Sequence, residues 1–482
     1  MLNYLLILWL AVGATGQILH LDPGSVQGFI HTTKSGPAAE VFLNIPYAAP
    51  PVGELRFEKP SPPIPWSSIR DGTKFGHTCH PHTQQAAVQP PPSEDCLTLN
   101  IIRPKKEAPK EGYPILLWVH GGGYEIGSTS IYGFRGFADI YIPHDVIVVT
   151  IQYRLGVYGF FSTGDSRIPG NLGLYDMAAA VKFVHANAPK FGGDRTRITA
   201  WGLSAGGSAV GQLALSPLTR DYIAGSIEMS GTPWASWAIG PTVANNSLHL
   251  AKALGCEGKG LKDCMKHATV RAIYDAVLDV EMIHGDYFKN HKDEATNELI
   301  DYYVDRDEEE VYDFYLDRYT EFVSDLFFNV PAVDGILSRR KAGWKMFAYS
   351  FDHYNEAIWR SDVPKRLRGS PHVNEYPYMF DVYVLGDFKI DAKEQIVADV
   401  IQQSFINFVK TGIPTNKHVS WEDVGNNENL KYLSISPEPK MKDKFYSGAA
   451  NFWHKMKGYG FDLVQMLPTR KNTTHNRDGN EL

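Results

Sequence analysis

Cysteine is scarce in this chain of 482 residues. There are four, Cys79, Cys96, Cys256 and Cys264, and they form no C-x-x-C pattern or Cys/His cluster. The patterns typical of zinc sites are therefore missing, and we expect no metal. Four cysteines fit an oxidising compartment, where two disulfides can form in any of three pairings. The pairing of sequence neighbours would close loops of about 17 and 8 residues.

Long apolar runs are missing beyond the N-terminus. Residues 5–12 (LLILWLAV) are apolar, and the small residues Ala14 and Gly16 follow them. This pattern is typical of a secretory signal peptide, so we expect residues 1–16 to be removed by cleavage near Gly16. The run is too short for a transmembrane helix, and no later stretch is long and apolar enough to be one.

Two further sequence patterns bear on the compartment. Asn245 and Asn472 each begin an N-x-S/T sequon, which is consistent with glycosylation in the secretory pathway. Residues 479–482 (GNEL) are a degraded version of a K-D-E-L retention signal, and we favour chance similarity over retention. The sequence thus predicts a protein that is secreted or lies in the lumen of the endoplasmic reticulum.

An excess of basic residues is also absent. The chain has 54 Asp and Glu residues against 47 Lys and Arg, which gives a net charge of −7. This balance argues against a nucleic-acid-binding surface. We find no internal repeat and no low-complexity segment. The length alone allows one large domain or up to three smaller ones.

Buried strands and amphipathic helices alternate along the chain. Residues 114–119 (PILLWV) and 146–151 (VIVVTI) are continuous apolar runs, which suit strands covered on both faces. Residues 176–187 have helical periodicity, and 224–229 and 346–351 indicate further buried strands. This alternation predicts an α/β architecture.

The later part of the chain has a different composition. Tyr, Asp and Glu alternate at helical spacing between residues 289 and 328, and we interpret this stretch as a solvated pair of amphipathic helices rather than an acidic binding face. Residues 397–409 indicate a helix that ends at Thr411-Gly412-Ile413-Pro414.

A nucleophile is indicated at Ser204. Residues 202–206 (GLSAG) fit the G-x-S-x-G pattern, in which the serine lies on a strained strand-to-helix turn and needs small neighbours. Residues 198–201 predict the end of a strand and residues 205–215 a helix. The helix dipole is then positive at the serine, which suits a nucleophile that attacks an acyl carbon.

A glycine-rich loop supplies the second motif. His120-Gly121-Gly122-Gly123-Tyr124 directly follows the apolar strand that ends at Val119. Such a loop can direct backbone N–H groups at the oxygen of a reacting ester. A flexible loop is the alternative, but two motifs in this order, each after a strand, favour acyl transfer.

These motifs resemble those of the type-B carboxylesterases, which are cholinesterase-like α/β-hydrolases, and among them the gut esterases of invertebrates. The resemblance covers nearly all of the chain and includes FLNIPYAAPPVGELRFEKP (42–60), EDCLTLN (94–100), WVHGGGYEIGS (118–128), QYRLGVYGFFSTGD (152–165), PGNLGLYDM (169–177) and FGGDRTRITAWGLSAGG (191–207).

The resemblance implies one α/β-hydrolase domain over residues 17–482, with a central, mostly parallel sheet flanked by helices. It also implies that no cofactor is needed. The oxyanion would be bound by the N–H groups of Gly122, Gly123 and Ala205. The family supports the pairing of neighbouring cysteines, Cys79–Cys96 and Cys256–Cys264.

The catalytic base is assigned from the same resemblance. His372 begins HVNEYPYMF (372–380), which is similar to the family pattern H-x-x-E-[L/I]-P-Y-x-F, whose histidine is the base. It also follows the nucleophile, as the order Ser, acid, His requires. We expect its imidazole to take the Ser204 proton and return it to the leaving alcohol.

Two departures of the chain from the family matter for its chemistry. Leu203 stands where cholinesterases often have Glu, which removes a negative charge beside the nucleophile and favours neutral esters over cationic ones. The family's D-G-x-F-x-P stretch, and the strand that ends in the catalytic acid, have no counterpart between about 265 and 290. The acid is therefore unassigned. The local substitutes are Asp275, Asp279, Glu281 and Asp286, with a slight preference for Glu281.

The sequence therefore predicts a serine carboxylesterase that hydrolyses small neutral esters through an acyl-enzyme. Two alternatives remain: a non-catalytic or weakly active esterase-like binding protein, and a truncated form of an active enzyme. The retained Ser204, His372 and glycine loop favour the enzyme, whereas the missing acid favours the alternatives.

Overall fold

Strands and helices alternate along most of the chain in the computed structural model, which describes residues 17–240, 242–279, 291–308, 311–427 and 429–469. The strands are β1 (Ile18–Leu21), β2 (Gly24–Gln27), β3 (Phe29–Thr32), β4 (Ala38–Pro46), β5 (Arg70–Asp71), β6 (Thr98–Pro104), β7 (Tyr113–Val119), β8 (Ile147–Ile151), β9 (Gly193–Leu203), β10 (Gly225–Met229), β11 (Tyr349–Phe351), β12 (Tyr432–Ile435), β13 (Lys440–Lys442), β14 (Phe461–Asp462) and β15 (Leu467–Pro468). The helices are α1 (Thr129–Tyr132), α2 (Arg135–Tyr141), α3 (Gly156–Phe160), α4 (Leu172–Asn187), α5 (Ala205–Leu215), α6 (Ser236–Ile239), α7 (Val243–Ala253), α8 (Leu261–His267), α9 (Val270–Asp279), α10 (Lys292–Tyr303), α11 (Tyr312–Ser324), α12 (Val330–Lys341), α13 (Tyr376–Phe380), α14 (Ala392–Thr411) and α15 (Ser447–Met456).

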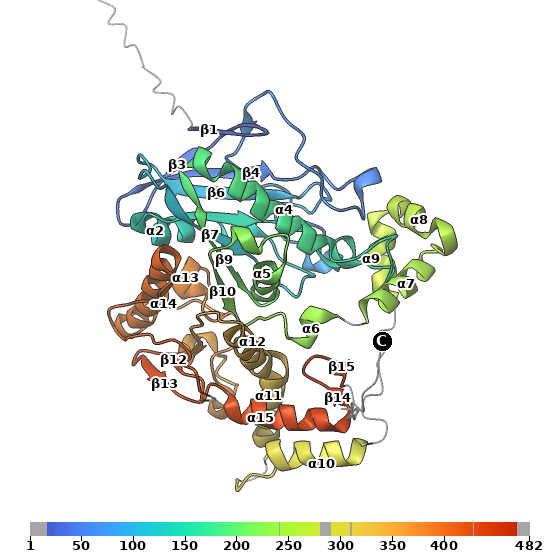
Figure 1. Ribbon diagram of the computed structural model, residues 1–482, viewed down its shortest axis with the longest axis vertical. Coiled ribbons are helices and arrows are strands. Elements are labelled where there is room, and N and C mark those ends of the chain that lie inside the picture. The colour runs from blue at the N-terminus through green and yellow to red at the C-terminus, as the bar shows by residue number, and fades with distance from the viewer. Residues whose placement is uncertain (1–16, 241, 280–290, 309–310, 428, 470–482) are drawn as a thin grey trace, which may run out of the picture.

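A seven-stranded mixed sheet in the order β10-β9-β7-β8-β6-β4-β3 forms the centre of the structure (Figure 1). The four strands from β10 to β8 are parallel to one another, and the remaining strands pair antiparallel. Helices flank this sheet, so the predicted α/β-hydrolase class is confirmed. The sheet is more mixed than expected, but its parallel half carries both sequence motifs.

The buried strands supply two hydrophobic cores because their side chains alternate between the faces of the sheet. In β7, Ile115 and Leu117 join the core that contains α4 and α5, whereas Leu116 and Trp118 join the core that contains α2 and α14. The whole of β7 is buried. This double burial is the reason that the predicted strand is a continuous apolar run rather than an alternating one.

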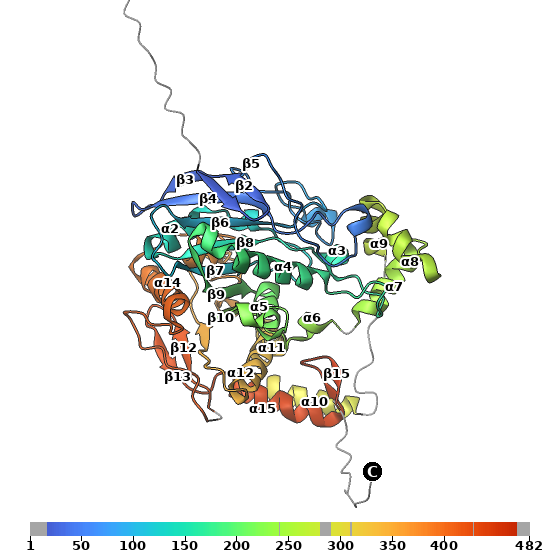
Figure 2. The ribbon, with the colours of Figure 1, turned by 45° about the horizontal axis from the view of Figure 1, so that its top comes forward.

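The C-terminal half adds helices and a small sheet. Strands β11, β12 and β13 form a separate three-stranded sheet, and Figures 1 and 2 both show α10 beside α15. The predicted buried strand over 346–351 is in part wrong: β11 has three residues, and each is half-buried. It is an edge strand of the small sheet, and its apolar residues also pack on neighbouring helices.

The helix predictions for this half are confirmed. Helices α10 and α11 form the expected pair, with Ala295, Tyr303 and Phe314 as their buried residues. Helix α14 ends at Thr411, and Gly412 adopts a left-handed conformation with φ of 75°.

Both neighbouring cysteine pairs, Cys79–Cys96 and Cys256–Cys264, form disulfides. None of the helices in the described ranges combines the length and apolar character that a bilayer span requires. Residues 1–16, where we expect a signal peptide, and the sequon at Asn472 lie outside the described residues.

A buried ion pair fixes the loop after β8 to α4. Arg154 and Asp176 are 3% and 0% exposed in their side chains. The guanidinium donates to both carboxylate oxygens of Asp176, at 2.8 and 2.7 Å, and the Arg154 backbone N–H donates at 3.1 Å. Removing one partner would leave the other charge buried without compensation.

We therefore expect Asp176→Ala to lower the free energy of unfolding by about 3–5 kcal/mol. Chemical denaturation monitored by tryptophan fluorescence measures this change. The matched control is Asp362→Ala, which removes an ion pair with Arg360 that is largely exposed and should cost less than about 1 kcal/mol. Equal losses in the two variants would contradict the assignment.

Candidate active site

Ser204 lies on the turn between β9 and α5. Its backbone has φ of 60° and ψ of −126°, which is a strained conformation for a residue with a side chain. The Ser204 N–H donates to the carbonyl of Met229 at 2.8 Å, which ties the turn to the end of β10. A Cβ on Gly202 would lie 2.4 Å from the carbonyl carbon of Gly206, so the turn needs glycine there, as its sequence predicts.

The glycine loop lies against this turn. A Cβ built on Gly121 would be 2.5 Å from the carbonyl oxygen of Leu203 and 3.1 Å from the Cβ of Ser204. Gly122 and Gly123 follow with φ of 115° and 64°. The loop and Ser204 come from adjacent parallel strands, β7 and β9, whose carboxyl ends meet at one edge of the sheet. The fold therefore places both motifs side by side.

Buried side chains hold the loop in place. The His120 ring stacks on Tyr153 at 4.4 Å, and the Tyr153 hydroxyl donates to the His120 carbonyl at 2.8 Å. Burial lowers the pKa of His120 to about 4, so its ring stays neutral. Tyr124 has a left-handed backbone with φ of 63°, and its hydroxyl donates to Gln212 on α5 at 3.4 Å. The loop is thus attached to the same helix that follows Ser204.

His372 lies on a turn that precedes α13. Its ring packs on Phe328, with ring centroids 5.0 Å apart, and Phe328 packs on Trp237 of α6, the helix that follows β10 along the chain. The side chain is exposed, yet the surrounding protein atoms desolvate the ring and lower its pKa. This favours the neutral imidazole that a general base requires.

No carboxylate of the described residues forms a hydrogen bond or ion pair with the His372 side chain. Asp275 pairs with Arg271 at 3.0 Å, so it is engaged elsewhere. Asp325, which lies near Phe328 in the π-helical turn Asp325–Asn329, accepts from Tyr303 and Asn329. Glu281 and Asp286 fall outside the described residues, as does the side chain of Asp279. The catalytic acid stays unassigned.

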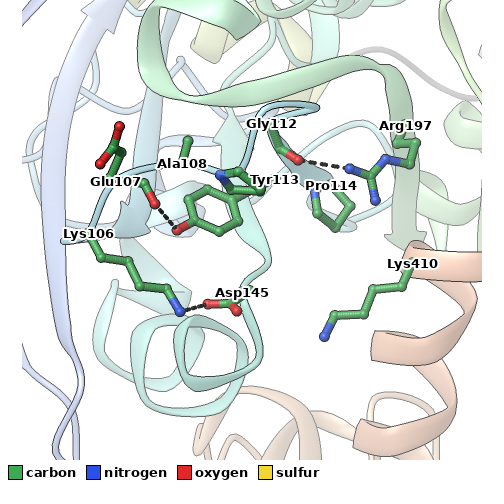
Figure 3. Close-up of a pocket in the computed structure, with 10 residues that line it drawn as sticks. Lys106, Glu107, Ala108, Gly112, Tyr113, Pro114, Asp145, Arg197 and Lys410 are labelled. Carbon is green, nitrogen blue, oxygen red and sulfur yellow. Dashed lines mark hydrogen bonds and ion pairs between the residues drawn. The ribbon is translucent and has the colours of Figure 1, made fainter.

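A cavity lies at the opposite end of the parallel strands from Ser204, and Figure 3 shows the residues that line it. It has a volume of about 550 Å³ and is lined by residues at the amino ends of the parallel strands, among them Tyr113, Asp145 and Arg197. About 20 Å of strand separates Arg197 from Ser204 at about 3.3 Å per residue. Two of its basic groups are already paired, Lys106 with Asp145 and Arg197 with Asp194. This cavity is not part of the site at Ser204.

Sequence reasoning missed several groups that shape the site. The carbonyl of Met229, the ring of Phe328 and the hydroxyls of Tyr132 and Tyr376 all contact motif residues or their loops. Of these groups, only Tyr376 could have been noticed in the sequence, because it stands where the family pattern has Leu or Ile. The other contacts depend on the tertiary structure.

Gly121→Ala tests the contact between the loop and Ser204. The added Cβ would meet Leu203 and Ser204, so the loop has to move and its N–H groups lose their direction. We expect labelling of the serine by a fluorophosphonate probe to slow by about 100-fold or more. Gly260→Ala is the control, because nothing lies within 4 Å of its Cβ. Labelling of Gly121→Ala at the control rate would contradict this geometry.

The chain is similar to several named esterases and hydrolases. The chain is 37% identical to gut esterase 1 of Caenorhabditis briggsae, and the alignment covers 97% of each protein. It is 28% identical to acylcarnitine hydrolase of Mus musculus over 91% of each, and 31% identical to pyrethroid hydrolase Ces2a of Mus musculus over 75% of this chain and 66% of that protein. The first alignment extends over 556 positions, more than the 482 residues present here. That relative therefore contains residues without a counterpart in this chain.

A model of the carboxylesterase family matches residues 15–287 and 278–453. The matched ranges include the glycine loop, the turn at Ser204 and the turn at His372. The family and the named esterases support hydrolysis of carboxylic esters, and they do not favour a non-catalytic binding protein. The chain belongs to the carboxylesterase family.

Proposed function

We propose that this enzyme hydrolyses neutral carboxylic esters with Ser204 as nucleophile and His372 as general base. The N–H groups of Gly122, Gly123 and Ala205 bind the oxyanion. The strained backbone at Ser204, with the glycine loop packed against it, is the observation that carries this proposal. Such a strained turn lowers the stability of the fold. Strained backbone of this kind therefore occurs mainly at functional sites, where it holds a reactive side chain in position.

The proposed reaction proceeds in two steps. His372 takes the proton of Ser204 while the serine oxygen attacks the ester carbon, and the oxyanion forms against the loop N–H groups. His372 then gives this proton to the leaving alcohol, and the acyl group stays on Ser204. Water attacks the acyl-enzyme with the same base, which releases the acid and restores the serine.

The residue before the nucleophile supports a preference for neutral esters. Leu203 is 0% exposed and belongs to a buried cluster with Trp118 and Trp201. It places no charge beside Ser204, so a cationic alcohol group would have no attractive partner at this position. Neutral esters do not need one.

We also propose that the segment carrying the catalytic acid is missing between about 265 and 290. Three observations support this. The family model matches in two separate pieces that overlap at residues 278–287, and the alignment with gut esterase 1 is longer than this chain. Within the described residues the parallel half of the central sheet ends at β10, with no further strand beside it. Losing the acid costs about ten-thousandfold in turnover in other triads but leaves residual catalysis, so we propose a slow esterase.

The proposed compartment is extracellular or the lumen of the endoplasmic reticulum. Two disulfides fit an oxidising environment, and the apolar run over residues 5–12 fits a signal peptide. Asn245 is exposed on α7, which supports its proposed glycosylation. Asn472 is the second proposed acceptor.

Labelling with a fluorophosphonate probe tests the nucleophile. Because the probe reacts with an activated serine, we expect Ser204→Ala to abolish labelling and ester hydrolysis together. His372→Ala should slow labelling by about 1,000-fold or more without changing the labelled site. Mass spectrometry of the labelled peptide identifies the residue. Label on any serine other than Ser204 would refute the proposal. The labelled fraction gives the concentration of active sites, and dividing the hydrolysis rate by that concentration gives the turnover per site.

The pH dependence of turnover tests the base. A protonated imidazole cannot accept the serine proton, so activity is present above the pKa of His372 and is lost as pH falls through it. The unperturbed pKa is about 6.5, and desolvation by the surrounding protein atoms lowers it, so the acid limb should lie below that value. We expect this limb in kcat/KM for a short-chain neutral ester. A rate that stays constant from about pH 8 to pH 4 would remove His372 from this role.

A further inference from the structure

Two buried tyrosines connect the glycine loop to the turn that carries His372. The hydroxyls of Tyr132, at the end of α1, and Tyr376, at the start of α13, form a hydrogen bond of 3.0 Å. The two residues are 6% and 5% exposed. Burial raises both phenol pKa values, that of Tyr132 to about 12, so both hydroxyls are neutral and one can donate to the other.

Each tyrosine is attached to one part of the site. The backbone of Gly121 lies near the Tyr132 hydroxyl and acts to lower the pKa of that phenol, and Gly121 is the residue that lies against Ser204. Tyr376 lies four residues after His372, and its backbone N–H donates to the carbonyl of Val373 at 3.2 Å. The hydrogen bond between the hydroxyls therefore links the two loops that have to meet at the substrate.

The turn at His372 needs such a link because it is strained. Val373 has φ of 71°, a left-handed conformation that is unfavourable for a β-branched residue and persists only when neighbours enforce it. Asn374 supplies one anchor through its side-chain amide, which donates to the carbonyl of His353 at 2.8 Å. Tyr376 supplies the second anchor, on the side of the glycine loop.

Tyr376 is also a departure of this chain from the family pattern, which has Leu or Ile at this position. An aliphatic side chain could fill the space but could not form a hydrogen bond with Tyr132. No carboxylate of the described residues orients the His372 ring, so the position of the ring depends on the turn itself. The hydroxyl of Tyr376 adds a directional contact to that turn.

We propose that the Tyr132–Tyr376 hydrogen bond positions His372 relative to the oxyanion loop, and that both tyrosines act as positioning residues. This inference rests on the proposed function, because it takes His372 as the base. Neither tyrosine donates a proton to the substrate in this scheme. Their effect on the rate comes from holding two loops at the separation that proton transfer requires.

Tyr376→Phe removes the hydroxyl and keeps the ring. We expect kcat for a short-chain neutral ester to fall by about 10- to 100-fold, with KM changed less than about twofold. Tyr141→Phe is the matched control, since Tyr141 is fully buried in the same core and its hydroxyl has no hydrogen-bond partner among the described residues. A kcat for Tyr376→Phe equal to that of the control would overturn the proposal.

A double substitution separates positioning from general destabilisation. If the two hydroxyls act through one contact, Tyr376→Phe should change kcat less than about twofold once Tyr132→Phe is present. Independent, multiplicative losses in the double variant would mean that the hydroxyls act separately, and would refute the link. A lower melting temperature with unchanged kcat would show a structural role only, which also refutes it.

Hydrogen exchange gives a readout that does not depend on catalysis. Tyr376→Phe should speed amide exchange in the peptide over residues 119–124, relative to the Tyr141→Phe control, because the glycine loop loses its tie to the other loop. Unchanged exchange in that peptide would overturn the link even if the protein proved inactive. Failure of the proposed function would appear separately, as unlabelled Ser204 in the unsubstituted protein.

Discussion

The site depends on the left-handed backbone of Ser204. A residue with a side chain at φ of 60° costs about 1–3 kcal/mol, so the surroundings have to enforce it. Parallel pairing of β9 with β7 and β10 does this, because it brings the carbonyl of Met229 to the Ser204 N–H and leaves room only for glycine at position 121. The serine is presented because three neighbouring strand ends fix its turn.

The second loop is strained at a different residue and is held by other means. Val373 is left-handed, and the turn is fixed through side chains of Asn374 and Tyr376 rather than by sheet pairing. Asn374 contacts the segment after β11, where His353 and Glu394 of α14 also form a hydrogen bond of 2.9 Å. The two halves of the site therefore differ in construction: the ends of paired strands hold the proposed nucleophile, Ser204, and a network of side chains holds the proposed base, His372.

The proposed loss of a segment between about 265 and 290 would affect the chemistry more than the fold. The parallel strands β8, β7, β9 and β10 and both cores are present without it, and the charged partners Glu228 on β10 and Arg339 on α12 are buried together at 2.9 Å. Helix α12 thus contacts the outermost parallel strand of the described chain. A fold can tolerate such a change at its outermost strand, whereas a triad without its acid loses most of its rate, because the acid orients the histidine through a single hydrogen bond.

The sequence by itself determined the parts of this protein that follow from local pattern. Apolar runs defined β7 and β8, the G-x-S-x-G turn defined the end of β9 and the start of α5, and the spacing of cysteines with the family resemblance gave both disulfides. It overestimated the strand over 346–351, because an apolar run does not reveal whether it pairs at the centre or at an edge of a sheet. The sequence by itself could not predict contacts between segments that are far apart along the chain. The close approach of Gly121 to Ser204, the packing of Phe328 on His372 and the hydrogen bond of Tyr132 with Tyr376 join residues that share no pattern along the chain, so only the tertiary structure decided them.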